Sequence, residues 1–375
     1  MRIYERDLTR RELLRRVGNL AQVGGIDLVT YEEGHARGVR ALQVNTGGGL
    51  RFSVHPDRGL DIGRAEFAGI GLAYLAPNMA PGPWYYEGKL DDYAWLRVGL
   101  GGLFNTAGLV TIGLPQTIPT EQYGFTQRMT DRYGTHGRIA VTPASRFTHG
   151  ERWDDDRCTL WIEGLVREEI AYGENLSLHR RFETELGSKS FRMVDVVAND
   201  GWFDSAHQLL YHFNIGYPIV DDASEVLASV TEEPADMSFT TRGDGGSTSR
   251  WRTATDPEAG FTHEGYVVSM RPDAGGKVAV AVVNRRLRPE LGGLGVYLRY
   301  DRRQLPVYIA WRMMREGLYA IGVEPSTNPF GKLDELLAAG YPLMLKPGEQ
   351  RTYELEFGVL DGDEAISGFA ASLPS

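Results

Sequence analysis

Apolar side chains alternate with polar ones in short runs along most of this chain, and Gly, Pro and Asp separate the runs. A repeat of two residues is typical of β-strands. Strands are therefore predicted at residues 28–31, 40–44, 50–54, 158–166, 176–186, 191–198, 266–270, 278–283, 295–300, 307–312, 319–323 and 352–359. So many strands with few helices between them predict antiparallel sheets that pack face to face or close on themselves, and a single large all-β sandwich is the simplest arrangement.

Two segments have the pattern of helices instead. The first covers residues 9–17, where Thr9 can cap the helix and Glu12 follows three positions later, as in a capping box. Gly18 then ends it. Residues 333–339 are predicted to form a second, shorter helix.

The predicted elements suggest two parts of unequal size. We expect a helical segment over residues 1–20 and one sandwich domain over residues 21–375. The glycines at 47–49 are predicted to form a turn between two strands, because no helix follows them as a phosphate loop requires. Residues 242–247 are predicted to form an exposed loop within the domain.

One predicted strand, within residues 209–218, carries polar side chains where an apolar strand would have none. His212 and Asn214 are two positions apart, so they lie on one face, while Tyr211, Phe213 and Ile215 lie on the other. Such a strand is typical of the wall of a ligand pocket. The alternative is that the two polar residues are a buried, hydrogen-bonded pair with no further role.

A carboxylate at the end of another strand offers a chemical partner for the histidine. Glu324 follows an apolar strand and precedes Pro325, and burial there would raise its pKa toward the range of a general base. Taken alone, a Glu-Pro pair is more typical of a turn. His136, between glycines, is a further candidate; with His212 and Glu324 it also forms a set that can bind metal, although no closely spaced histidine pair supports a metal site.

Arginines and aromatic residues supply candidate binding groups. Arg58 either points its donors at ligand hydroxyls or at an anion, or forms an ion pair with Asp61. Arg138 and Arg312 likewise suit an anionic group or an internal ion pair. The aromatic residues at 84–86 and 93–95 suit stacking on sugar rings and filling a core equally well, and the glycine-rich stretch 99–109 suits a pocket wall or close packing.

The composition narrows the class of protein. The chain has 375 residues, of which 42% are hydrophobic and 24% are charged, as in globular proteins. Its net charge of −10 argues against a nucleic-acid groove, which needs a basic face. No stretch approaches the ~18 apolar residues of a membrane span, and the first residues lack the apolar core of a secretory signal, so we expect a cytoplasmic protein. The single cysteine, Cys158, excludes an internal disulfide and is predicted to be an inert core residue.

Several motifs together resemble those of a known family. They are the stretches 57–63 and 101–109, His136-Gly137-Arg138, residues 211–218, Trp311-Arg312-Met313-Met314, residues 319–328 and the closing 345–349. In order along most of the chain, they resemble the aldose 1-epimerase (galactose mutarotase-like) superfamily, and within it the DUF4432 branch. The resemblance implies a β-supersandwich with a short N-terminal helix and a sugar-binding cleft across one sheet.

The resemblance also implies roles for individual residues. Glu324 matches the base that takes the proton from the anomeric hydroxyl, and His212 matches the acid that protonates the ring oxygen. The expected substrate-binding residues are Arg58, His136, Arg138, Asn214, Asn328 and Trp311. The family's sugar-binding aspartate has no counterpart, and His263-Glu264 lies in that region instead.

Three functions follow from this resemblance. The first is an isomerase that interconverts sugar anomers without a cofactor or a metal. The second is an epimerase, isomerase or lyase acting on a modified or keto sugar. The third is a sugar-binding protein without catalysis. In each case the expected partner is a small carbohydrate, with no nucleic acid and no membrane, and the sequence leaves a homodimer open.

Overall fold

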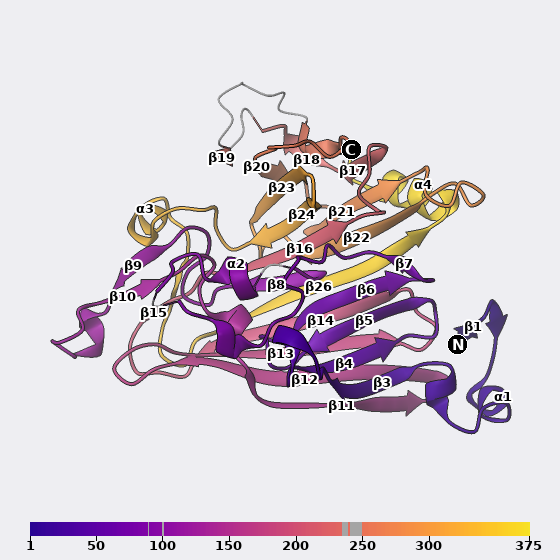
Figure 1. Ribbon diagram of the computed structural model, residues 1–375, viewed down its shortest axis with the longest axis horizontal. Helices are drawn as coiled ribbons and strands as arrows, with labels where there is room; N and C mark the ends of the chain where they lie inside the picture. The colour runs from indigo at the N-terminus through magenta and orange to yellow at the C-terminus, as the bar shows by residue number, and fades with distance from the viewer. Residues whose placement is uncertain (89, 100, 235–238, 241–249) are drawn as a thin grey trace.

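Two large antiparallel sheets, stacked face to face, make up most of the protein in this computed structural model (Figure 1). The structure describes residues 1–88, 90–99, 101–234, 239–240 and 250–375. The predicted loop at 242–247 lies outside the described residues.

The eight-stranded sheet contains, in spatial order, β11 (Ala144–Asp154), β12 (Arg157–Glu169), β13 (Asn175–Glu185), β14 (Ser190–Asn199), β26 (Gln350–Asp361), β22 (Leu294–Asp301), β21 (Lys277–Asn284) and β17 (Ser224–Ala228). The twelve-stranded sheet contains β18 (Val230–Glu232), β20 (Glu264–Met270), β23 (Val307–Arg315), β24 (Leu318–Ser326), β16 (Leu210–Gly216), β8 (Phe104–Ala107), β6 (Asp61–Phe67), β5 (Leu50–His55), β4 (Arg40–Asn45) and β3 (Gly25–Thr30), with β19 (Phe239–Thr240) beside β20 and β7 (Ile70–Gly71) beside β6. Three strand pairs stand apart: β1 (Arg2–Ile3) with β2 (Arg6–Asp7), β9 (Gln116–Pro119) with β10 (Thr130–Tyr133), and β15 (Ser205–Ala206) with β25 (Met344–Leu345).

Helices are short and lie mainly at the margins of the sheets (Figure 1). The α-helices are α1 (Arg10–Leu14), α2 (Trp95–Val98), α3 (Leu333–Ala338) and α4 (Asp363–Ser372). The 3-10 helices are η1 (Leu20–Gln22), η2 (Gly34–Ala36), η3 (Pro83–Tyr85), η4 (Glu121–Tyr123), η5 (Ile139–Val141) and η6 (Arg250–Arg252). Within the described residues, no helix is long and apolar enough to cross a membrane.

The predicted strands are all present, most of them extended by one to three residues, and the glycine turn at 47–49 joins β4 to β5. The helix predicted at residues 333–339 is confirmed as α3, but the helix predicted at residues 9–17 is too long. The Thr9 side chain accepts a hydrogen bond from the Glu12 amide, as a capping box requires. However, α1 ends at Leu14, because the Arg16 amide donates to the Leu13 carbonyl three residues back and so breaks the four-residue pattern of the helix. Neither α2 nor α4 was predicted.

The N-terminal segment packs against the edge of the eight-stranded sheet. Leu13 of α1 shares a buried cluster with Ile3, Leu160 and Cys158. Burial raises the pKa of the Cys158 thiol to about 11, so the thiol stays protonated, as the sequence predicts for an inert core residue.

The main core lies between the two sheets, and the inner face of β16 stands at its centre. Tyr211, Phe213 and Ile215 point into this core, and the Phe213 ring stacks on Phe357 of β26 with 5.8 Å between ring centroids. Burial of one such side chain contributes roughly 1.5–3 kcal/mol. The predicted alternation along this strand is confirmed, since Tyr211, Phe213 and Ile215 all face the core.

A buried ion-pair network ties β16 to the opposite sheet. Arg180 of β13 is fully buried and pairs with Asp195 of β14 at 2.7 Å and with Asp61 of β6 at 3.1 Å. The Tyr211 hydroxyl donates to Asp195 at 2.8 Å, and the Thr106 hydroxyl donates to Asp61 at 2.5 Å. A buried charge needs such partners, and these contacts fix β16 and β8 in register with the sheet beneath them.

Candidate active site

An acid–base pair stands on adjacent strands of the twelve-stranded sheet. The register that pairs Leu210 with Ser326 and Phe213 with Val323 puts His212 of β16 opposite Glu324 of β24. Their side chains meet on the sheet face that points away from the main core, with 3.3 Å between His212 Nε2 and Glu324 Oε1. The structure thus brings together the two residues predicted to be catalytic.

Aromatic rings enclose this pair. The centroid of the His136 ring lies 5.7 Å from that of the His212 ring, and the two rings are nearly perpendicular. The centroid of the Trp311 ring, on β23, lies 5.5 Å from that of His212. Trp95 of α2 lies 4.6 Å from His136 and 6.0 Å from His212. Two predicted binding residues, His136 and Trp311, therefore flank the pair together with an indole that the sequence did not single out.

The loop that carries His136 fixes the orientation of its ring. His136 has a φ of 61°, and its backbone amide donates to the Gly113 carbonyl at 2.9 Å. The Gly113 amide lies 3.4 Å from His136 Nδ1, which accepts its hydrogen bond. An accepting Nδ1 carries no proton, so the His136 ring is neutral.

Burial sets the charge state of the pair. The pKa of His212 falls to about 3, first because burial penalises the imidazolium and then because His136 lies close. Burial likewise lowers the pKa of His136 to about 4 and raises the pKa of Glu324 well above its ordinary value of 4.5. Burial therefore favours the uncharged form of both groups, the neutral imidazole of His212 and the protonated carboxyl of Glu324.

Polar atoms without partners gather around the pair. In the part of the chain that the structure describes, His212 Nδ1, Glu324 Oε1, Asn214 Oδ1 and Trp95 Nε1 are buried and make no hydrogen bond. Buried polar atoms are usually satisfied, and exceptions are common where a ligand completes the bonding. Such a group of atoms is typical of a binding site for a molecule rich in hydroxyl groups.

Arg58 lies in the wall of this region and holds α2. Its Nη2 donates to the carbonyls of Val98 and, at 3.2 Å, Gly99. Burial lowers its pKa to about 10. The ion pair with Asp61 that the sequence offered as an alternative does not form, because Asp61 is engaged by Arg180 and Thr106.

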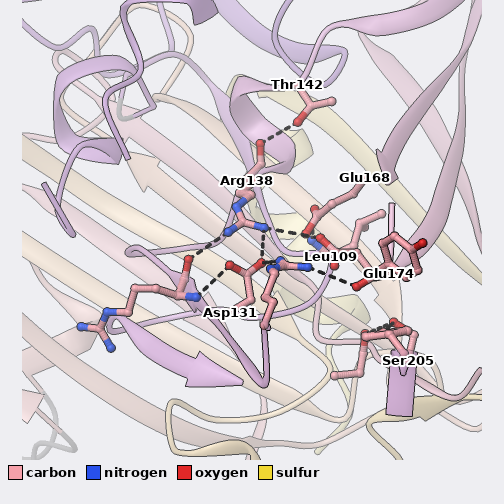
Figure 2. Close-up of polar contacts among 12 residues, drawn as sticks. Leu109, Asp131, Arg138, Thr142, Glu168, Glu174 and Ser205 are labelled. Atoms are coloured by element: carbon pink, nitrogen blue, oxygen red, sulfur yellow. Dashed lines mark hydrogen bonds and ion pairs between the residues drawn. The ribbon is translucent and has the colours of Figure 1, made fainter. Parts of the chain in front are cut away.

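The remaining predicted residues use their polar groups within the fold. Arg138 pairs with Asp131 at 2.9 Å and with Glu174 at 3.4 Å (Figure 2). Its guanidinium also stacks on the Tyr133 ring.

Two predicted amides also make contacts within the fold. Asn328 donates to Gln208 and to the Pro329 carbonyl, at 3.0 and 2.9 Å. Asn214 donates to Asn105 and to the Gly102 carbonyl, both at 3.2 Å, and only its Oδ1 is left for a ligand. Sugar contacts by Arg138 and Asn328 stay predictions that require these bonds to be exchanged.

The fold and the site can now be compared with known proteins. Residues 36–359 match the sequence profile of a domain of unknown function, DUF4432. The chain belongs to the DUF4432 family. No curated protein matches the chain.

Solved structures share the fold of this DUF4432 protein. The proposed aldose 1-epimerase of Klebsiella pneumoniae superposes with a TM-score of 0.80 at 22% identity, over 93% of this chain and 86% of that one. The galactose 1-epimerase of Lactobacillus acidophilus gives 0.56 at 12% identity, over 91% and 100% of the two chains. A galactose mutarotase-like protein of Clostridium acetobutylicum gives 0.55 at 13%, over 91% and 99%. The fold is therefore the galactose mutarotase-like β-sandwich.

The DUF4432 protein departs from the expected pattern at one position. Glu264 of β20, in the region where the resemblance implies a sugar-binding aspartate, pairs with Arg312 at 3.0 Å and with Arg250 at 2.9 Å. Both ion pairs tie Glu264 to arginines of the fold, while its Oε1 makes no hydrogen bond among the described residues. Arg312 is likewise paired internally, as one alternative held.

Trp95 is the site residue that sequence reasoning did not choose. The sequence shows aromatic residues at 93–95 but not which residues they contact, because their partners lie far along the chain.

The sequence also left a metal site open as an alternative. The described residues include no group of three or more His, Cys, Asp or Glu side chains arranged to hold a metal ion.

Proposed function

We propose that this protein is an aldose 1-epimerase-like isomerase that interconverts sugar anomers by acid–base ring opening at the His212–Glu324 pair. The observation that carries the proposal is the 3.3 Å contact between His212 Nε2 and Glu324 Oε1 on the sheet face that points away from the main core. The named epimerases and mutarotase-like proteins of the same fold support it.

The proton count of the pair suits this reaction. Ring opening removes the proton of the anomeric hydroxyl, forms the C1 carbonyl, breaks the bond between C1 and the ring oxygen, and returns a proton to that oxygen. One group must accept a proton while the other donates one, and the pair holds one proton between two such groups. We assign proton removal to Glu324 and ring-oxygen protonation to His212, after the proton has passed from the carboxyl to the imidazole. Rotation about the C1–C2 bond and reclosure give the other anomer.

Exchange NMR tests the proposal with D-galactose, D-glucose, D-fructose and D-glucuronate as probes. The wild type should accelerate anomer exchange of at least one sugar, and Glu324→Gln and His212→Asn should each lower kcat by roughly 100-fold or more, as loss of a general acid or base does. The matched controls are Glu364→Gln and His179→Asn, which change exposed side chains of the same kinds. Full turnover in both site variants would refute the residue assignment.

Two other outcomes of this experiment would favour one of the other two functions instead. Binding of a sugar without exchange would identify a sugar-binding protein that has kept the fold. A new product peak would identify epimerisation at another carbon, isomerisation or elimination by the same pair.

A further inference from the structure

The His212–Glu324 pair is closed off from solvent. The His212 and Glu324 side chains are only 7% and 2% exposed, so a sugar cannot touch either group without displacing part of the protein. Strands β16 and β24 cannot be displaced, because their inner faces are built into the core and into the ion-pair network of Arg180. Whatever gives way must come from the side of the pair opposite the core.

Trp95 covers the pair from that side. Its indole is 2% exposed and packs with Tyr74, Ala140 and Trp311, next to both histidine rings. Its Nε1 nevertheless has no hydrogen-bond partner among the described residues. A buried indole N–H usually finds an acceptor, so this ring lies where a hydrogen-bonding molecule would fit better.

The element that carries Trp95 is weakly held. Helix α2 has four residues, and its N-cap, Ala94, offers no side-chain bond to the first turn. Leu96 on the same helix is 52% exposed. The polar hold on its C-terminal end comes from two side chains: Arg58 bonds the carbonyls of Val98 and Gly99, and the half-exposed Asn78 bonds those of Leu96 and Arg97. A helix of one turn, anchored by the buried Trp95 and Val98 and held by two side chains, is able to open while the sheets stay folded.

We propose that Trp95 is the gate of the site: α2 swings aside when Arg58 and Asn78 release its carbonyls, and only then does a sugar reach His212 and Glu324. This inference rests on the proposed function for the identity of the ligand, but the opening itself is a property of the protein alone. Opening also admits water, which removes the burial that keeps the pair uncharged and lets Glu324 ionise for proton removal.

Hydrogen exchange on the intact wild type tests the opening without any sugar. Amides of residues 94–99 should exchange roughly 100-fold faster than those of β16 and β24, as expected for a local opening that spares the core. Equal protection of α2 and these strands would refute the gate.

Chemical modification tests whether the opening exposes the pair. Diethyl pyrocarbonate should modify His212 about 10-fold faster in Trp95→Ala and in Arg58→Lys, which lacks the planar guanidinium that reaches two carbonyls. Modification of the exposed His179 should not change, and Arg299→Lys, at a half-buried arginine of β22 in the other sheet, should behave as wild type. Trp95→Phe, which keeps a ring, serves if Trp95→Ala does not fold.

The two proposals fail in distinguishable ways. A His212 that stays unreactive in folded Trp95 and Arg58 variants would overturn the gate even if sugars are interconverted. If none of the four sugars shows exchange while His212 responds as predicted, the gate stands and the proposed reaction fails.

Discussion

Glycine at position 322 makes room for the Glu324 carboxyl. A Cβ there would lie 2.3 Å from Glu324 Oε1 and 2.9 Å from the Trp311 Cβ, so Gly322→Ala must displace the carboxyl. Because a misplacement of about 1 Å can cost roughly 100-fold in rate, we expect anomer exchange to fall by that order while the protein folds. The control is Gly368→Ala, which meets no atom within 4 Å. Unchanged exchange by the Gly322 variant would contradict the assigned role of Glu324.

Glu168 is a second carboxyl whose environment favours its protonated form (Figure 2). Its Oε2 accepts from the Leu109 amide at 2.9 Å, while its Oε1 is buried without a partner. Burial, and then the neighbouring Glu174, raise its pKa from 4.5 to about 7. The folded protein therefore binds this proton more tightly than the unfolded chain does.

This shift predicts how stability depends on pH at one residue. Because the folded pKa is the higher one, the contribution of Glu168 is full below pH 4.5 and is lost as the pH rises toward about 7. Glu168→Gln cannot ionise, so it should be more stable than the wild type at pH 8, by up to about 3 kcal/mol. Urea unfolding at pH 5 and pH 8 measures the difference. A gain of equal size at both pH values would show that Glu168 is not the titrating group.

At the residue scale, the sequence predicted which way a side chain faces better than which partners it contacts. His212 could be placed on an outward face because alternation with Tyr211 and Phe213 leaves no other choice. The partners of Arg58 and Arg138 could not be foreseen, because they lie on segments such as Val98 and Glu174, tens of positions away in the sequence.

At the scale of elements, periodicity predicted most of the long strands that bury one face and missed others, among them β8, whose four residues are all buried. Strand β11 is an edge strand whose side chains are mostly exposed, so its sequence carries little alternation of apolar and polar residues. Helix α4 escaped notice because only Ile366 and Phe369 are buried along its ten residues. Helix α2 could not be predicted, because four residues give no helical repeat and Trp95 is held by tertiary contacts.

At the scale of the whole molecule, buried histidines set the response to acid. Burial lowers the pKa of His55 and His212 to about 3 and that of His136 and His207 to about 4. These rings are neutral in the folded protein, whereas the unfolded chain protonates them near pH 6.5.

Three buried carboxyls, Asp61, Glu168 and Glu324, oppose the histidines, because burial raises the pKa of each. The four histidines outnumber them, so unfolding should take up protons and stability should fall as the pH drops from about 5.5 to 4.5. Urea unfolding across this range measures the slope, and a flat profile would show that the histidines are not buried as described.

The active pair stands on strands, whereas its cover comes from loops and a single helical turn. This division separates what evolution and protein engineers can change from what they cannot. Replacing α2 (Trp95–Val98) is expected to change which molecules reach the pair without disturbing the sheet, much as antibody loops vary on a constant framework. Relatives within DUF4432 should therefore differ in substrate mainly through the segment that corresponds to α2. Grafting that segment between members should transfer specificity while strands β16 and β24 stay unchanged.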